Sequence, residues 1–330
     1  MTDQSKIPTK GAKPVDAAGS LYERANGIYG FDSLRPNAPP RNLPPAHNVA
    51  PVPRQAPQPV ARQTPFAGVA EAPVTPDAPV KPQAQRVALS GGHVAIDREH
   101  LRAGGMIVPD GPVTALLEEF RIVKREILGD ARETGTDAAR CILVCSPHSG
   151  EGKTYCATNL AIAMAAERDI EVVLVDADFH KPSVPRVLGF ESQAGFMDTL
   201  ADPSIAPESL VLETDIEGLF VLPSGSRTTS DAEYLASERT SEVLRRLTQG
   251  APNRFLVFDT PPALAASPAA ELAKHVGQAL LVARADSTGQ SALEDAHQLL
   301  SACPDIKLLL NATHFSPSGR SFGTYEGFGS

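Results

Sequence analysis

Several residue types are scarce in this chain of 330 residues, and each scarcity excludes a class of protein. There is no tryptophan, aromatic residues make up 5% of the chain, and the cysteines number four, namely Cys141, Cys145, Cys156 and Cys303. They lack metal-site spacing, so we expect reduced, buried thiols in a cytoplasmic protein. No apolar run approaches the roughly 20 residues of a membrane span, and the N-terminus lacks the apolar core of a signal peptide. We therefore expect any membrane association to depend on a partner.

Positive charge is also scarce beyond the first part of the chain. The net charge is −9, but residues 1–90 carry ten Lys and Arg against six Asp and Glu, which leaves −13 for the rest. An acidic folded part argues against nucleic acid as a main partner. Of the 30 prolines, 16 precede residue 83. We predict that residues 1–90 form a disordered tail, because they cannot bury enough apolar surface to offset about 1–2 kcal/mol of backbone entropy per residue.

Beyond the tail, apolar runs alternate with helical patterns in the manner of a parallel α/β sheet. Strands buried on both faces are predicted at 141–145, 171–176, 218–223, 254–259, 278–284 and 306–311. Helical patterns cover 94–104, 113–128, 153–166, 232–247, 268–275 and 291–301. Right-handed crossovers place the carboxyl ends of such strands at one edge, and we expect ligands to bind there.

A glycine-rich stretch follows the first predicted strand. Gly150 and Gly152 permit a tight turn whose backbone N–H groups converge on phosphate, and the next helix points its positive end at the same anion. Pro147 stands where the usual G-x-x-x-x-G-K-[ST] pattern has its first glycine. The alternative is an ordinary glycine turn between a strand and a helix. We predict a nucleotide-binding loop made of Ser149, Gly150, Glu151, Gly152, Lys153, Thr154 and Tyr155.

Three carboxylates end two other predicted strands. Asp176 and Asp178 follow one strand and Asp259 ends another. Mg²⁺ needs only one or two carboxylates besides phosphate and a hydroxyl, so we predict Thr154, Asp176 and Asp259 as metal ligands. Asp178 is predicted to be a base for an incoming hydroxyl or water, and Lys153 a cation for the terminal phosphates. The alternative for any single aspartate is a helix cap. The predicted catalytic set is Lys153, Asp176, Asp178 and Asp259.

Taken together, these motifs resemble the cytoplasmic domain of bacterial tyrosine kinases that serve capsule and exopolysaccharide export, including exosortase-associated autokinases. The matching stretches are 146–154, 173–178 with 181–182, 222–225 and 258–262. The resemblance implies a MinD-like (SIMIBI) P-loop NTPase fold, with a helical segment at 91–135 before a kinase domain at 136–314. It also implies ATP and Mg²⁺ as cofactors, a membrane chain-length protein as partner, and a location at the inner face of the plasma membrane.

Two further features of that family are only partly matched. Its Glu-x-x-Arg-x-x-Arg helix, used for ring-like self-association, corresponds to Glu118, Arg121 and Lys124, which we predict to form an oligomer interface. The alternative is a solvated helix face, and lysine lacks the bidentate pairing of arginine. The family phosphorylates a cluster of tyrosines in a flexible tail. Residues 315–330 hold only Tyr325, the predicted phosphoacceptor for a neighbouring subunit.

Two alternative functions remain open from the sequence. One is a partitioning ATPase of the ParA or MinD type. Proteins of that type share the predicted sheet, but they carry a lysine at the position that His148 occupies in this chain. The other is a non-catalytic ATP-binding adaptor of the export machinery, and the single tail tyrosine favours it.

Overall fold

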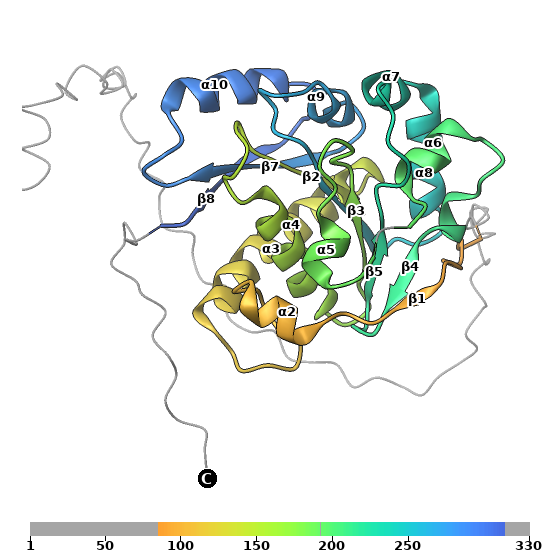
Figure 1. Cartoon of the computed structure of the whole chain (residues 1–330), viewed down its shortest axis with the longest axis horizontal. Coiled ribbons are helices and arrows are strands. Elements are labelled where there is room, and N and C mark those ends of the chain that lie inside the picture. Colours follow the sequence, from red (N-terminus) through yellow and green to blue (C-terminus); the bar gives the residue numbers. More distant parts are fainter. Residues whose placement is uncertain (1–84, 192, 314–330) are drawn as a thin grey trace, which may run out of the picture. The chain divides into compact units, whose positions relative to one another are not determined.

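The computed structural model describes residues 85–191 and 193–313 (Figure 1). An eight-stranded sheet runs through this part in the order β1-β4-β5-β3-β6-β2-β7-β8. All neighbouring strands are parallel except the antiparallel β4–β5 pair. The strands are β1 (His93–Val94), β2 (Cys141–Cys145), β3 (Glu171–Asp176), β4 (Leu212–Thr214), β5 (Leu219–Leu222), β6 (Arg254–Asp259), β7 (Gln278–Arg284) and β8 (Ile306–Asn311).

Helices cover both faces of the sheet. The α-helices are α2 (Arg98–Ala103), α3 (Ala115–Thr134), α4 (Lys153–Ala165), α5 (Val184–Leu188), α6 (Phe196–Ala201), α7 (Asp231–Leu235), α8 (Glu238–Thr248), α9 (Pro268–Ala273) and α10 (Gln290–Leu299). Short 3₁₀ turns lie at Ala138–Arg140 and Pro207–Ser209. Because successive strand residues point to opposite faces, the central strands feed two separate cores. Helices α2 to α5 pack on one core, and α6 to α10 pack on the other (Figure 1).

The six predicted strands and the mostly parallel sheet are confirmed. The helix predicted over 232–247 is wrong, because the chain breaks into α7 and α8 at Ser237, whose backbone is extended. There the Ser237 hydroxyl donates to the Tyr234 carbonyl at 2.6 Å, and the Thr240 hydroxyl donates to it at 3.1 Å. Such side-chain bonds to backbone offer an alternative to continuing a helix.

The segment before the phosphate loop belongs to the same compact unit as the sheet. Strand β1 pairs with β4, where the sequence predicted a helical pattern from residue 94, and only α2 is helical. The Ile107 N–H donates to the Asn159 side chain of α4 at 2.8 Å. Within the described residues, no helix is both long and apolar enough to cross a membrane.

Most of the predicted disordered tail lies outside the described residues, as does residue 315 onward. For residues 85–90 the prediction of disorder is wrong. The Val87 N–H donates to the Gln249 carbonyl at 3.2 Å, and the Val87 carbonyl accepts from the buried Arg254 guanidinium at 3.0 Å. These bonds satisfy backbone groups of the segment and tie it to the domain.

Candidate functional site

The glycine-rich loop joins β2 to α4 at the carboxyl edge of the sheet, as the sequence predicts. Gly150 and Gly152 have φ angles of +84° and +97°, in the left-handed region that favours glycine. A Cβ on Gly152 would also lie 2.0 Å from the Asn311 side-chain nitrogen. The positive φ angle therefore favours glycine at this position, and a Cβ there would also displace the Asn311 carboxamide. Helix α4 begins at Lys153, so its first N–H groups lack intrahelical partners and point toward the loop.

The Glu151 side chain stabilises the phosphate loop through hydrogen bonds. Its side chain is buried and accepts hydrogen bonds from the His148 N–H at 2.7 Å and from the Thr288 hydroxyl at 2.5 Å. The Glu151 carbonyl accepts from the Asn311 carboxamide at 2.9 Å, and the Gly150 carbonyl accepts from Arg284 at 3.3 Å. The Glu151 carboxylate therefore shapes the loop, and any contact with nucleotide falls to its backbone.

Three of these partners were missed from the sequence, namely Arg284, Thr288 and Asn311. They lie at or just after the carboxyl ends of β7 and β8. Because those ends meet the phosphate loop at one sheet edge, strand position was the signal that could have identified them.

Lys153 and Asp178 form an ion pair, with 3.1 Å between the Lys153 Nζ and the Asp178 Oδ2 atoms. Both side chains are largely buried. Burial lowers the pKa of Lys153, but the negative charges of Asp259 and Asp178 outweigh it and hold the pKa above its ordinary value. The site therefore keeps a permanent cation, which Asp178 positions at the start of α4.

Asp259 carries an unsatisfied oxygen. The Thr154 hydroxyl donates to its Oδ2 at 2.6 Å, while its buried Oδ1 has no hydrogen-bond partner among the described residues. Burial raises the pKa of Asp259 to about 7. Ser183, which the sequence did not single out, lies with its hydroxyl 3.1 Å from that of Thr154.

This donor set fits Mg²⁺. A hard cation prefers a carboxylate and a hydroxyl oxygen, and it would satisfy the buried Oδ1 atom of Asp259. In the described part of the chain, no group of three or more His, Cys, Asp and Glu is arranged to hold a metal alone. Thr154 and Asp259 would therefore hold the ion together with phosphate and water.

Asp176 organises the loop between β3 and α5. Its Oδ2 accepts from the Ser183 N–H at 2.9 Å and the Val184 N–H at 3.0 Å, and its Oδ1 accepts from the Asp178 N–H at 3.2 Å. Burial raises its pKa to about 6 against the opposing effect of these bonds. Asp176 thus satisfies backbone donors at the start of α5, and its role as a metal ligand stays a prediction.

Tyr155 points away from the phosphate loop. Its hydroxyl donates to the Gly105 carbonyl at 2.8 Å, which fastens α4 to the segment that precedes α3. The ring is used in this contact, and a nucleotide contact through the Tyr155 N–H in the first turn of α4 stays a prediction. Ser149 is exposed at the tip of the loop, where its backbone remains available to phosphate.

The predicted oligomer interface is only partly exposed. Glu118 and Arg121 form an ion pair on α3, with each side chain about one-third exposed. Lys124 is 5% exposed, donates to the Ala163 carbonyl at 2.8 Å, and pairs with Glu167 at 2.8 Å. The Lys124 ammonium group is used inside the α3–α4 contact, and its place in an oligomer interface stays a prediction. Tyr325 lies outside the described residues.

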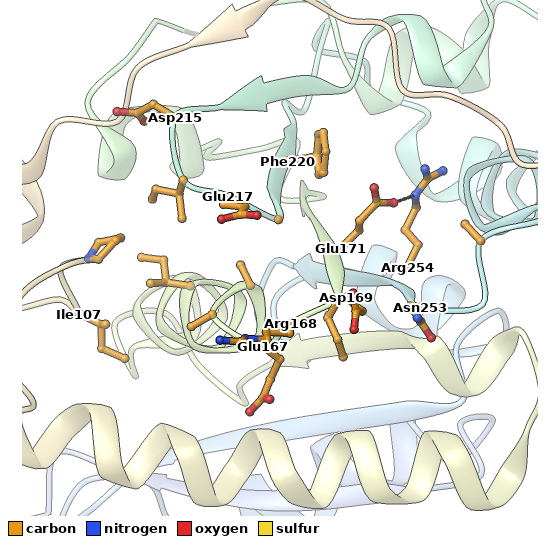
Figure 2. Close-up of a pocket in the computed structure, with 18 of the residues that line it drawn as sticks. Ile107, Glu167, Arg168, Asp169, Glu171, Asp215, Glu217, Phe220, Asn253 and Arg254 are labelled. Carbon is orange, nitrogen blue, oxygen red and sulfur yellow. Dashed lines mark hydrogen bonds and ion pairs between the residues drawn. The ribbon is translucent and has the colours of Figure 1, made fainter.

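A cavity of about 1010 Å³ lies at the opposite edge of the sheet, where the parallel strands begin (Figure 2). It is lined by charges of both signs, including the buried Arg254, which pairs with Glu171 at 2.9 Å. Glu217 has no ion-pair partner in the part of the chain that the structure describes, and such a carboxylate does not by itself identify a ligand. The cavity contains none of the predicted site residues and is separate from the phosphate loop.

Comparisons with known proteins find a P-loop NTPase family and tyrosine-protein kinases that are similar to this chain. The ParA family, described as NUBPL iron-transfer P-loop NTPase, matches residues 137–283. The tyrosine-protein kinase YwqD of Bacillus subtilis (strain 168) is 30% identical over 193 residues, which cover 57% of this chain and 80% of YwqD. The putative tyrosine-protein kinase CapB of Staphylococcus aureus is 25% identical over 196 residues, which cover 59% of this chain and 83% of CapB.

Among solved structures, the crystal structure of the chimerical protein CapA2B2 matches with a TM-score of 0.52 and 23% identity. The match covers 67% of this chain and 93% of that protein. At this identity it supports the P-loop NTPase fold alone, in which a glycine-rich loop binds nucleotide phosphates.

Proposed function

Because this chain belongs to the bacterial tyrosine-protein kinase family, we propose that it is a protein-tyrosine autokinase that uses ATP and Mg²⁺. The observation that supports this most directly is the grouping of Lys153, Asp178 and the Thr154–Asp259 pair around the phosphate loop. At one edge of the sheet, Lys153 supplies a cation, Asp178 a base, and the Thr154–Asp259 pair oxygen ligands for a hard metal ion. Phosphoryl transfer needs mainly such positioning and charge stabilisation.

Each residue has a definite task in this proposal. The N–H groups of the loop and of the first turn of α4 bind the phosphates, and Lys153 stabilises the charge that develops on the γ-phosphoryl group. Mg²⁺ held by Thr154 and Asp259 would neutralise charge on the β- and γ-phosphates. Asp178 takes the proton of the Tyr325 hydroxyl while that oxygen bonds to phosphorus. The bond from phosphorus to the ADP oxygen breaks, and ADP leaves with the electron pair.

The wider role follows from family membership. We place the kinase in the regulation of exopolysaccharide or capsule polymerisation and export, together with a membrane chain-length protein at the inner face of the plasma membrane. A phosphorylated tyrosine adds nearly two negative charges, which an acidic domain repels. Phosphorylation is therefore a physical route to releasing subunits from an assembly. Deleting the gene should alter the length distribution of the secreted polymer, and an unchanged distribution would contradict this role.

The match to the ParA family favours a second candidate, a partitioning ATPase. Such proteins carry a lysine at the position of His148, which here is exposed and contributes its backbone N–H to Glu151. DNA- or lipid-stimulated release of free phosphate, without labelled protein, would support this candidate over the kinase.

The direct test of the kinase uses the full chain with γ-labelled ATP and Mg²⁺. Label should appear on the protein and disappear in Tyr325→Phe. The matched control is Tyr234→Phe on α7, the same chemical change at a tyrosine outside the predicted site residues, which should keep the label. Equal label in both variants would place the acceptor elsewhere. No label in the unaltered chain, even with a membrane partner's cytoplasmic segment added, would favour the non-catalytic adaptor.

A further inference from the structure

A histidine and a buried aspartate that the proposed function does not use meet at the carboxyl edge of the sheet. His180 lies in the loop after β3, and Asp231 is the first residue of α7. The Nδ1 atom of His180 lies 3.2 Å from the Oδ2 atom of Asp231. The Asp231 side chain is 8% exposed, whereas the His180 side chain is 61% exposed. A buried carboxylate therefore contacts one nitrogen of a mostly exposed imidazole ring.

One oxygen of Asp231 lacks a hydrogen-bond donor among the described residues. The Oδ1 atom accepts from the Ala232 N–H at 3.0 Å, but the buried Oδ2 atom has no hydrogen-bond partner. Buried polar atoms are rarely left without a partner. A small rotation of the exposed His180 ring would bring its Nδ1–H into line with this oxygen. We therefore interpret Asp231 as the group that holds the ring in place.

The loop that carries His180 is also fixed to the phosphate site. Asp178 accepts the Lys181 N–H at 3.0 Å through Oδ1, and its Oδ2 pairs with Lys153 at 3.1 Å. Between them, Phe179 is buried in the core. Residues two apart in a chain have Cα atoms within about 7 Å of each other. His180 therefore lies close to the aspartate that positions the phosphate-binding cation.

Phosphoryl transfer needs positive groups on several sides of the transferred group. In a loose transition state the charge spreads over three equatorial oxygens. In the proposed function Lys153 supplies one positive group, and Mg²⁺ would supply another. A protonated imidazole donates from both nitrogens, so His180 can bind Asp231 through Nδ1–H and keep Nε2–H for a phosphoryl oxygen. Within residues 85–191 and 193–313, this Nε2 atom has no hydrogen-bond partner.

From these observations we infer that His180 binds the phosphoryl group during its transfer and that Asp231 positions the imidazole ring. His180 forms no covalent bond in this role and donates only a hydrogen bond. The inference deepens the proposed function and rests on it, because it adds a residue that contacts the same reacting group. The neighbouring Lys181 is exposed and forms no ion pair in the described part of the chain, so no carboxylate positions it.

Binding of a transition-state mimic tests this contact without any phosphoacceptor. Calorimetric titration of the full chain compares Mg-ADP alone with Mg-ADP plus aluminium fluoride, which imitates the phosphoryl group in transfer. His180→Ala should weaken binding of the mimic about 100-fold, as expected for the loss of one such donor, and should change the affinity for Mg-ADP less than about twofold. His297→Ala, the same change at an exposed position of α10, is the matched control and should leave both affinities unchanged.

The outcomes separate the inference from the proposed function. Equal affinity for the mimic in His180→Ala and in the unaltered chain would overturn the inference alone. A loss in Lys181→Ala instead of His180→Ala would assign the contact to the lysine and would also overturn it. An unaltered chain that does not bind Mg-ADP would contradict the proposed function, and the inference with it.

Two further variants distinguish a phosphoryl contact from a structural role. His180→Arg keeps a cation that can pair with Asp231 and with a phosphoryl oxygen, so it should retain affinity for the mimic within about tenfold. Asp231→Asn should weaken binding of the mimic about tenfold, but it should have no further effect in the His180→Ala chain, because both changes act on one contact. Additive losses, or a loss in His180→Arg as large as in His180→Ala, would contradict the inference.

Discussion

Replacing Asp259 by asparagine should stabilise the protein in the absence of ligand while removing its Mg²⁺-dependent function. Asp259 is fully buried, and its Oδ1 has no hydrogen-bond partner among the described residues. An ionised carboxylate in this position is costly, because the surrounding core cannot solvate it. Asparagine has nearly the same shape, and its side-chain oxygen can still accept the Thr154 hydroxyl. The change therefore removes the charge and leaves the packing intact.

The size of the effect follows from the pKa of Asp259. Burial raises it from 3.8 to about 7, so between these values the folded protein holds a proton that the unfolded chain has lost. Stability therefore falls as pH rises through this window and is constant above it. A shift of about 3 pKa units corresponds to about 4 kcal/mol lost between pH 4 and pH 7. The attraction to Lys153 disappears in Asp259→Asn and offsets part of the gain.

Urea unfolding of the ligand-free protein at about pH 5 and about pH 8 measures this difference. The free energy of unfolding of Asp259→Asn should exceed that of the unaltered protein at the higher pH by about 2–4 kcal/mol, and by less at the lower pH. Asp286→Asn, the same change at an exposed turn, is the control and should stay within about 0.5 kcal/mol. Parallel pH dependence of the Asp259 variant and the unaltered protein would refute the argument.

Two other substitutions test separate parts of the site and fold. Thr154→Val keeps the side-chain shape but removes the hydroxyl that contacts Asp259; calorimetric titration should show about 10- to 100-fold weaker Mg²⁺-dependent nucleotide binding, and unchanged affinity would remove Thr154 from the metal site. Lys124→Ala should lower the free energy of unfolding by about 1–3 kcal/mol without altering the oligomeric state in size-exclusion chromatography. The exposed neighbour variant Arg125→Ala is the control, and an altered oligomeric state at unchanged stability would place Lys124 in an interface.

The strands could be predicted because each buried strand is a short continuous apolar run, and its edges are marked by polar or turn residues. Strands β3 and β6 are buried on both faces, so their residues are continuously apolar and do not alternate between apolar and polar. Strands β1 and β4 have two and three residues. Runs that short carry no period, and only pairing with a neighbouring strand makes them extended. Their positions are properties of the folded sheet rather than of local sequence.

The site residues also divide into those that local sequence indicates and those that only the folded sheet brings together. Lys153, Thr154 and Asp259 could be predicted because each belongs to a local string at a strand end. Strand position could have placed Thr288 and Asn311 at the same sheet edge as the loop, but their contacts with Glu151 form only after β7 and β8 have joined the sheet beside β2. Tertiary contacts of this kind leave no local pattern.

At Lys124 the helical spacing indicated a buried position, but its charge led us to predict an exposed one. Helix α3 buries Phe120, Lys124, Ile127, Leu128 and Ala131, at spacings that place all five on one face. Charge suggested an exposed position for the lysine, whereas its place in the period indicated the core. A long lysine stem packs well against apolar surface when its ammonium group finds partners, and here the Ala163 carbonyl and Glu167 provide them.

The charges at the sheet edge explain why ATP and Mg²⁺ should act as a unit. When all three carboxylates are ionised, Asp176, Asp178 and Asp259 outnumber the Lys153 ammonium by two negative charges. The free nucleotide would bring further negative charge toward the buried Asp259 carboxylate, which forms no ion pair within residues 85–191 and 193–313. A divalent ion held by Asp259 and Thr154 would supply positive charge that attracts both the carboxylate and the phosphates. We therefore expect the unsatisfied Asp259 oxygen to lower the affinity for nucleotide alone and to raise the dependence of binding on Mg²⁺.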